Sequence, residues 1–277
     1  MSASAFAVDV EFVWGFQARV AGLSKTSPSF HYPPPTTFLG ALGESIAREL
    51  GVGESAGRKI ITVLGRALLA FGLKPMNCIP LKYEDINKII AVKMTSGILY
   101  PNPGNLSSSY DSPARGKTIM ASLDENPPII RFIIVLKEEE IKFKDEVTII
   151  DEDHFWKIHR LGSKESRVSV VDVKRYNDVN ALDGRTYSEY SFPIINGVNP
   201  IGLQGRWLYE SYINPREVSY TERDNPTSIY MEGRSLIPFR IPVLVTRIER
   251  PKLMAEVRYP AAFYKINGEG IVIGWKG

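Results

Sequence analysis

Residues 30–50 read Phe30-His-Tyr-Pro-Pro-Pro-Thr-Thr-Phe-Leu-Gly-Ala-Leu-Gly-Glu-Ser-Ile-Ala-Arg-Glu-Leu50, a triple-proline loop that runs directly into an amphipathic helix. The prolines fix φ and donate no hydrogen bond, so they hold the helix entry rigid. We expect Thr36 or Thr37 to cap the first turn. A rigid helix N-terminus collects free N–H groups and partial positive charge, which suits a phosphate. Behind the cap, one face is apolar, with Leu39, Leu42, Ile46 and Leu50.

The segment before this helix predicts one long β-strand. Apolar residues alternate along it, at Phe6, Val8, Val10, Phe12, Trp14, Phe16, Ala18 and Val20. The intervening positions include Asp9, Glu11, Gln17 and Arg19, so we expect the second face to be partly wet. Gly15 is the natural place for a bend or bulge.

The composition is that of an ordinary globular protein and limits the classes of function. The net charge of +3 is too small to indicate nucleic-acid binding, so a basic site must be a local concentration. Cys78 is the only cysteine, which excludes internal disulfides and cysteine-based metal clusters. The three histidines, His31, His154 and His159, are too few to make a convincing zinc site by themselves. We therefore expect no cofactor. With no membrane-spanning run and no basic signal region, we expect a cytoplasmic protein without a membrane partner.

The order of predicted elements indicates an α+β fold. We expect a second helix over 55–71, strands over 89–94, 129–136, 141–150 and 167–174, and a short helix over 152–159. Allowing for one extra strand, this matches the β-α-β-β-α-β plan of a ferredoxin-like or RRM-like sheet. After residue 180, Gly, Pro, Asn and Tyr become frequent and helical periodicity ends. We therefore expect a ferredoxin-like domain over 1–180 and a smaller β-rich C-terminal subdomain over 181–277.

Residues 96–126 form the longest stretch without periodicity in the first part of the chain. About thirty residues rich in Ser, Pro, Gly and Asn are too many for an ordinary connection. The stretch contains Tyr100, Tyr110, Arg115 and Lys117, which favour a functional arm over a plain linker.

The strongest concentration of positive charge lies between residues 160 and 175. Its first half, Arg160-Leu-Gly-Ser-Lys-Glu-Ser-Arg167, is a loop of small residues with cations at Arg160, Lys164 and Arg167. Backbone amides beside Lys and Arg suit a phosphodiester backbone, and a solvated hairpin turn is the alternative. The aromatic RNP1 string of an ordinary RRM is missing, so RNA would be held by loops, helix ends and the arm.

Two glycine-containing motifs lack the context that their chemistry requires. Gly53-Glu-Ser-Ala-Gly57 matches the nucleophile elbow of α/β-hydrolases, but a predicted helix precedes it where the elbow needs a strand. We expect Ser55 to cap the second helix, and a serine hydrolase is a remote alternative. Gly268-Glu-Gly270 leads into a β-segment that ends at Gly274, and a tight hairpin is favoured over a phosphate-binding loop.

The first strand, the Pro-Pro-Pro-Thr-Thr-Phe-Leu-Gly-Ala-Leu entry, the arm and the Arg-Leu-Gly-Ser-Lys-Glu-Ser loop together resemble the CRISPR-associated RAMP proteins. The chain is most similar to the subunit that caps the 5′ handle of the guide RNA in type I (Cascade) effector complexes, the fifth Cas family, in its archaeal type I-A form. The resemblance covers residues 1–180 well and the remainder loosely. It implies a ferredoxin-like core with a thumb-like insertion and a single copy at one end of a helical filament.

The resemblance also implies partners and a site. The partners are the crRNA 5′ handle, a filament-forming RAMP subunit and the large Cascade subunit. The handle would be contacted from the helix entry, the thumb and the glycine-bearing loop. The candidate RNA-binding residues are Arg19, Lys25, His31, Tyr32, Thr36, Thr37, Tyr100, Tyr110, Arg115, Lys117, Arg160, Lys164 and Arg167.

Two functions remain open for such a subunit. In most subtypes it is not the nuclease, which implies a non-catalytic RNA-binding role in antiviral defence. The alternative is a metal-independent endoribonuclease that processes CRISPR repeat RNA and uses His31 with Tyr32 or Lys25 as acid–base partners.

Overall fold

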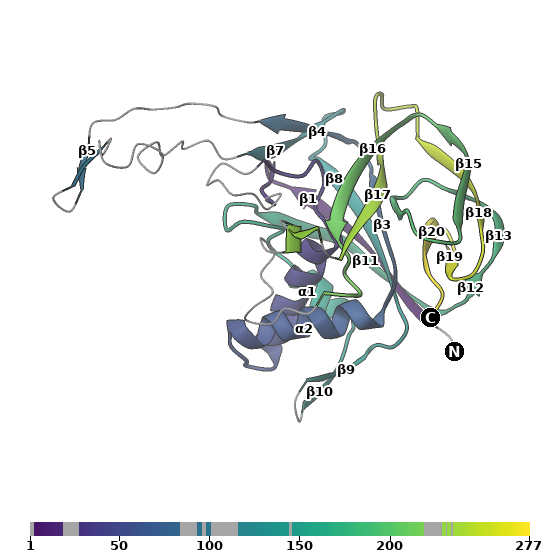
Figure 1. Ribbon diagram of the computed structural model, residues 1–277, viewed down its shortest axis with the longest axis horizontal. Coiled ribbons are helices and arrows are strands. Elements are labelled where there is room, and N and C mark those ends of the chain that lie inside the picture. The colour runs from purple at the N-terminus through teal and green to yellow at the C-terminus, as the bar shows by residue number, and fades with distance from the viewer. Residues whose placement is uncertain are drawn as a thin grey trace.

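The computed structural model describes residues 3–18, 28–83, 93–95, 98–100, 116–143, 146–218, 229–230, 232–233 and 235–277. For residues 54–58, 93–95 and 98–100 it describes the backbone alone. The fold is α+β with a predominance of strands, as Figure 1 shows. Among the described residues, none of the helices is long and apolar enough to cross a membrane.

The largest sheet of the described chain has seven strands in the order β11-β1-β8-β3-β20-β19-β12, with every neighbouring pair antiparallel. In chain order its strands are β1 (Ala3–Phe12), β3 (Leu68–Pro75), β8 (Ile129–Leu136), β11 (Val168–Val179), β12 (Ala181–Leu182), β19 (Ala261–Ile266) and β20 (Gly270–Trp275). Strands β11 and β12 lie at opposite ends of this order, yet only Asn180 separates them in the chain. The sheet must therefore curl until its two ends approach each other.

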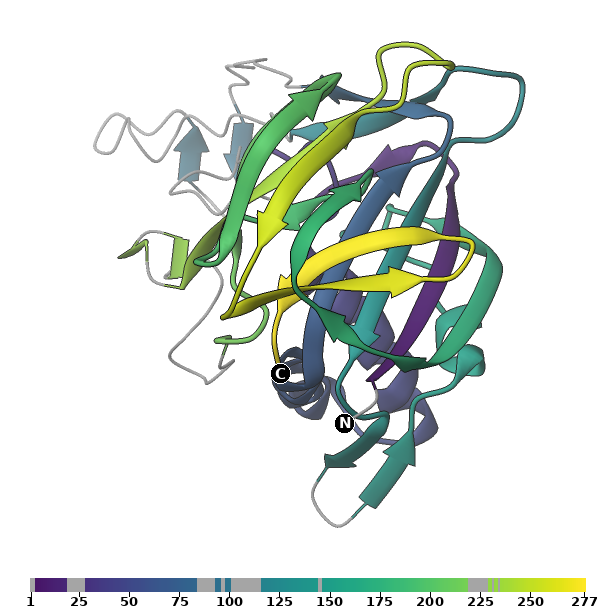
Figure 2. The same ribbon diagram turned by 90° about the vertical axis from the view of Figure 1, so that its right-hand side faces the viewer.

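The two faces of the curled sheet are covered by different elements. Helices α1 (Pro35–Glu49) and α2 (Glu54–Ala67) pack behind the sheet, and the β19–β20 hairpin, which belongs to the curled part of the same sheet, crosses in front of the other strands (Figure 2). The short helix α4 (Glu152–Trp156) packs beside α1 and begins at Asp151, whose carboxylate accepts the His154 backbone N–H.

Strand β1 confirms the predicted alternation, but it ends at Phe12, before the predicted end near Val20. Phe6, Val8, Val10 and Phe12 are buried toward the helices. On the second face Asp9 and Glu11 are partly exposed, as expected, whereas Ala3, Ala5 and Ala7 are buried beneath the C-terminal strands. Small alanine side chains permit this close approach. The strand bends before Gly15, as predicted, where φ is +146° and a Cβ would lie 2.0 Å from the Thr118 carbonyl oxygen.

Helix α1 presents the predicted apolar face to the sheet. Leu39, Leu42 and Ile46 are fully buried. The expected cap is wrong: Pro34 is the N-cap and Pro35 takes the first helical position, so Thr36 and Thr37 follow inside the first turn. Proline suits that first position because its missing N–H would have had no partner inside the helix.

Two predicted elements are corrected by the structure, and a third lies largely outside the described residues. Helix α2 ends at Ala67, and residues 68–71, which were expected to be helical, begin strand β3. A continuous apolar run fits the helical period and the strand period equally well, and here the run is buried on both faces of the sheet. The segment expected as one strand over 141–150 is a hairpin of β9 (Glu140–Phe143) and β10 (Glu146–Ile149). Of the strand expected over 89–94, residues 89–92 lie outside the described residues.

The predicted arm begins and ends in β-structure. A small sheet of β2 (Gly15–Phe16), β7 (Lys117–Ser122) and β4 (Cys78–Tyr83) forms its base. Strands β5 (Lys93–Thr95) and β6 (Ile98–Tyr100) pair with each other, and Figure 1 shows β5 far from the body. Residues 101–115 of the predicted arm lie outside the described residues.

The C-terminal part is rich in strands, as expected. One three-stranded sheet contains β13 (Gly184–Ser188), β15 (Val198–Gln204) and β18 (Lys252–Val257). Another contains β14 (Phe192–Pro193), β16 (Arg206–Ile213) and β17 (Leu236–Val243). Because β12, β19 and β20 complete the large sheet, the two parts share one framework. A subdomain boundary at residue 180 stays a prediction.

Replacing Phe38 tests how far the fold depends on the helix that carries the proline entry. The Phe38 ring centroid lies 4.7 Å from that of Phe132 and 5.9 Å from that of Phe71. We expect Phe38→Ala to lower the free energy of unfolding by about 3–5 kcal/mol because it leaves a cavity in the core. Tyr187→Ala, on an exposed strand position, should cost less than about 1 kcal/mol. Urea unfolding measures both, and equal losses would contradict this role for Phe38.

Candidate nucleic-acid interface

The first turn of α1 and the Arg160–Arg167 loop meet in one surface hollow, called here the helix-entry hollow. Its volume is about 280 Å³, and it is lined by Thr36, Thr37, Gly40, Ala41, Glu44, Arg160 and Gly162. Three of the sequence-predicted RNA-binding residues, Thr36, Thr37 and Arg160, are thus brought together although more than 120 positions separate the threonines from Arg160. The hollow combines hydroxyls, one guanidinium and small residues that leave room for a ligand.

The Arg160–Arg167 loop is fixed in shape by the segment that follows strand β2. The Ser163 N–H donates to the Gln17 carbonyl at 3.0 Å, and the Gln17 N–H donates to the Ser166 hydroxyl at 2.9 Å. Gly162 has φ +110°, and a Cβ there would lie 2.5 Å from the Gln17 carbonyl oxygen. Only glycine meets both requirements without strain. The loop is therefore a built turn that holds its cations in set places.

The three cations of the loop differ in their surroundings. The Arg160 guanidinium is partly buried and contacts the Glu44 carboxylate at 2.9 Å. Lys164 is 84% exposed and only loosely paired with Glu165, at 3.9 Å, and Arg167 is exposed. Although burial raises it, the pKa of Glu44 is lowered overall by the hydrogen bond and charge of Arg160, with further contributions from Arg48 and His159. Glu44 is therefore ionised at neutral pH, when it holds Arg160.

The base of the arm lies against the same loop. The Lys117 ammonium lies 5.8 Å from the centre of the Trp14 ring, and the Trp14 indole N–H donates to the Glu165 carbonyl at 2.8 Å. Lys117 is exposed on β7. Lys117 is thus the predicted RNA-binding residue of the arm that the structure places near the loop. Tyr100 lies in β6 with an undescribed side chain, and Arg19, Lys25, Tyr110 and Arg115 lie outside the described residues.

His31 and Tyr32 have different environments in spite of being adjacent. The His31 Nδ1 atom lies 2.8 Å from Glu210 Oε1, and the other oxygen of Glu210 accepts the Tyr212 hydroxyl at 2.7 Å. Tyr32 is fully buried, and that burial raises its pKa well above the usual range. The structure therefore corrects its assignment: Tyr32 is a core residue whose ring cannot contact RNA in this conformation.

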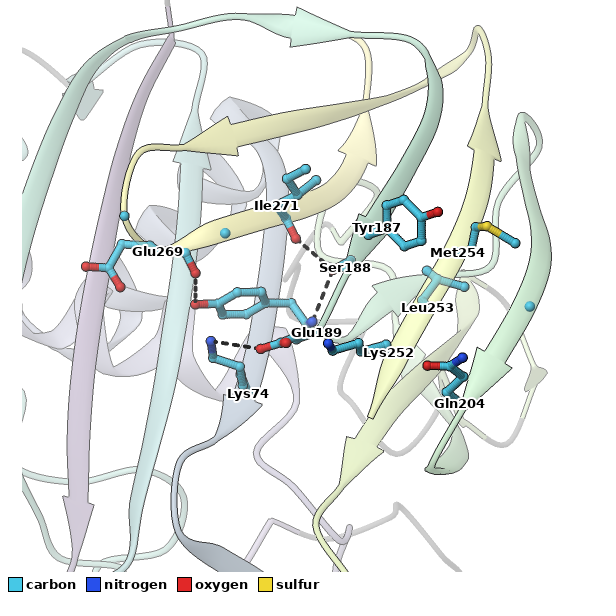
Figure 3. Close-up of a pocket in the computed structure, with 14 residues that line it drawn as sticks. Lys74, Tyr187, Ser188, Glu189, Gln204, Lys252, Leu253, Met254, Glu269 and Ile271 are labelled. Atoms are coloured by element: carbon cyan, nitrogen blue, oxygen red, sulfur yellow. Dashed lines mark hydrogen bonds and ion pairs between the residues drawn. The ribbon is translucent and has the colours of Figure 1, made fainter. Parts of the chain in front are cut away.

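A second hollow of about 900 Å³ lies between the large sheet and the β13–β18–β15 sheet (Figure 3). Its lining carries two lysines and two glutamates, and three of these have partners within the protein. Lys74 lies 3.5 Å from Glu189 and its ammonium sits over the Tyr190 ring, while Glu269 belongs to a network with Arg131. Gly268 lies in the turn of the β19–β20 hairpin and Gly270 begins β20, so the hairpin favoured from the sequence is confirmed. The linings of both hollows are balanced in charge, but the loop that carries Arg160 adds the exposed cations Lys164 and Arg167, so the helix-entry hollow is the better anion site.

Other candidate chemistry finds little support in the geometry. Ser55 is the second residue of α2, behind a helix and a turn, where a nucleophile elbow requires a strand; it is not the N-cap, since Gly53 takes that place. Among the residues that the structure describes, no group of three or more His, Cys, Asp or Glu side chains is arranged to hold a metal ion.

Several residues of the interface were not found from the sequence. Gln17, Glu44, Trp14 and Glu210 each act through a contact with a residue far along the chain. Of these residues, Glu44 had the clearest signal in the sequence. It lies one helical turn before Arg48 and one turn after Gly40, a spacing that predicts an ion pair on the surface of α1.

Known proteins resemble this chain in both sequence and structure. A CRISPR protein from Archaeoglobus fulgidus, known from a crystal structure, is 45% identical with a TM-score of 0.74, over 99% of this chain and 100% of that one. CRISPR-associated protein Cas5 2 of Saccharolobus solfataricus is 25% identical over 184 residues, which span 65% of this chain and 64% of that relative's length. No protein-family model matches the chain. The chain belongs to the CRISPR-associated proteins. Its similarity to Cas5 2 supports a RAMP subunit of the Cas5 type.

Replacing Gly162 tests whether the loop depends on its close approach to Gln17. We expect Gly162→Ala to lower the free energy of unfolding by about 1–3 kcal/mol, because the Cβ adds a clash to an unfavourable φ. Gly268→Ala is the matched control: φ there is +81°, but a Cβ would meet nothing within 4 Å. Thermal unfolding compares the two. A larger loss at Gly268 would show that the clash with Gln17 does not fix the loop.

Proposed function

We propose that this chain is a non-catalytic guide-RNA-binding subunit of a Cascade-like CRISPR interference complex, where it holds the 5′ handle of the crRNA and caps the filament. The observation that carries the proposal is the convergence of the α1 entry, the Arg160–Arg167 loop and the base of the arm. Membership of the Cas5 type supports the choice of RNA as the ligand. The proposed partners are the filament-forming RAMP subunit and the large Cascade subunit.

The strand order supports a ferredoxin-like core within the large sheet. Strands β1, β3, β8 and β11 correspond to the first, second, third and fourth strands of a β-α-β-β-α-β unit, with α1 and α2 at the first crossover and α4 at the second. Their spatial order β11-β1-β8-β3 is 4-1-3-2 in that numbering. We infer that this is the RAMP core and that the β4–β7 base carries its thumb.

The chemistry of the interface suits a phosphodiester backbone. Arg160, Lys164 and Arg167 offer charge-assisted donors within one short loop, and the threonines of α1 add hydroxyl donors on the opposite wall. Such contacts position a strand without reading its bases. Recognition of the handle would then draw on the path of its backbone as much as on its sequence.

Neutralising the loop tests the RNA-binding proposal. We expect Arg160→Gln, Lys164→Gln and Arg167→Gln together to weaken binding of CRISPR-repeat RNA and to reduce the slope of log K against log salt by about 2, since each lost contact to a single strand removes about 0.7. The matched control is Arg185→Gln, Arg258→Gln and Lys265→Gln, which removes the same charge from exposed C-terminal positions. Fluorescence anisotropy at several salt concentrations measures both. Equal slopes in the two triple variants would refute the assignment of the loop.

One observation favours endoribonuclease activity as a second candidate function. His31 is half-exposed, and Glu210 lies 2.8 Å from its Nδ1 atom, an arrangement that orients an imidazole for proton transfer. The proposal of a non-catalytic role predicts that repeat RNA stays intact when incubated with the pure protein in EDTA. A discrete cut that is lost in His31→Ala, and kept in the buried-position control His154→Ala, would establish the second function instead.

A further inference from the structure

We propose that Glu44 is a built-in competitor for the RNA backbone: its carboxylate holds the Arg160 guanidinium in the free protein, and an RNA phosphate must displace it. The inference rests on the proposed RNA-binding function and deepens it. In this view Glu44 sets the affinity and the selectivity with which the helix-entry hollow binds a polyanion.

Glu44 is shared between two arginines, with one oxygen for each. Its Oε2 atom lies 2.9 Å from Arg160 Nη2, and its Oε1 atom lies 2.7 Å from Arg48 Nη2. Arg48 lies one turn further along α1, whereas Arg160 comes from the loop. When Arg160 leaves, Glu44 therefore keeps a partner, and its charge stays compensated.

The carboxylate lies on the wall of the hollow that would receive the phosphate. The rest of the lining consists of hydroxyls, glycines and one alanine beside Arg160, so Glu44 is the acidic group among the lining residues. A carboxylate and a phosphate oxygen are the same kind of acceptor for a guanidinium. Both cannot take the same face of Arg160, and their like charges repel each other at short range.

The exchange has a defined chemical form. Arg160 changes its acceptor from Glu44 Oε2 to a phosphate oxygen, while Glu44 Oε1 remains on Arg48; no covalent bond changes. The neighbouring acidic residue of the helix, Glu49, is engaged elsewhere, since its carboxylate accepts from Lys157 at 2.9 Å. Displacing Glu44 from Arg160 costs free energy. A single loosely held phosphate does not offset this cost, but an RNA strand that also contacts the other loop cations does.

The test compares full-length variants by fluorescence anisotropy with labelled CRISPR-repeat RNA and with polyuridine. We expect Glu44→Gln to bind both ligands about three- to fivefold more tightly than the unmodified protein, the range of a partly exposed ion pair. The larger gain is expected for polyuridine, so selectivity falls. Glu49→Gln removes the same charge from the same helix outside the hollow and should change affinity less than about twofold. In an Arg160→Gln background, the gain from Glu44→Gln should vanish.

The contrary outcomes are distinct. Weaker binding by Glu44→Gln would mean that Glu44 orients Arg160 for RNA, which overturns the competitor role and leaves the RNA-binding function intact. An equal gain in Glu49→Gln, or a gain that persists without Arg160, would reduce the effect to net charge and also overturn it. RNA binding that is undetectable in the unmodified protein, or that Arg160→Gln leaves unchanged, would refute the proposed function itself and this inference with it.

Discussion

The curled sheet depends on one arginine beneath the C-terminal hairpin. Arg131 of β8 donates from Nε and Nη2 to the two oxygens of Asp9 on β1, at 2.6 Å each, and its Nη1 contacts Glu269 at the β19–β20 turn. Glu269 also accepts from Lys174 and from the Tyr176 hydroxyl of β11. Buried charges are tolerated only when they are paired in this way. The network therefore ties three strands of the sheet to the hairpin that covers them.

This arrangement determines where the neighbouring strands lie. Strand β20 reaches β3 at one position, Gly274 against Ala70, and Tyr190 occupies the space where the two strands diverge. The Tyr190 hydroxyl donates to the Glu269 carbonyl at 3.0 Å, and Gly72 leaves room for its ring. Strand β1, buried on both faces, leads through the bend at Gly15 to Gln17, which holds the Arg160–Arg167 loop. The framework and the candidate interface are thus parts of one continuous structure.

The features predictable from sequence are those that local patterns control. The apolar face of α1, the buried strand β8 and the small-residue basic loop follow from period and composition. The boundary between α2 and β3 could not be found, because the apolar run there satisfies either period and its burial on two faces is decided by distant strands. Tyr32 was misassigned because an aromatic residue beside a basic site suits either stacking on RNA or packing in a core.

The same distinction explains what was missed in the interface. Glu44, Gln17 and Glu210 each contact a residue of the interface that lies more than 100 positions away in the chain. Once the sheet order brings the loop to the helix entry, each contact has a simple physical cause, but no spacing in the sequence encodes it. Only the resemblance to RAMP proteins predicted that the helix entry, the arm and the basic loop act together, because local sequence patterns do not report contacts between distant segments.

The hydrogen bonds between Gln17 and the Arg160–Arg167 loop also affect the thermodynamics of ligand binding at that loop. A loop already closed by backbone hydrogen bonds, with a glycine pressed against its neighbour, has little conformational freedom left to lose when a ligand arrives. Most of the ordering cost then falls on the single-stranded ligand, and within the protein it is confined to the long cationic side chains. An RNA strand bound at the proposed interface would therefore adapt its own conformation to a protein surface that is already formed.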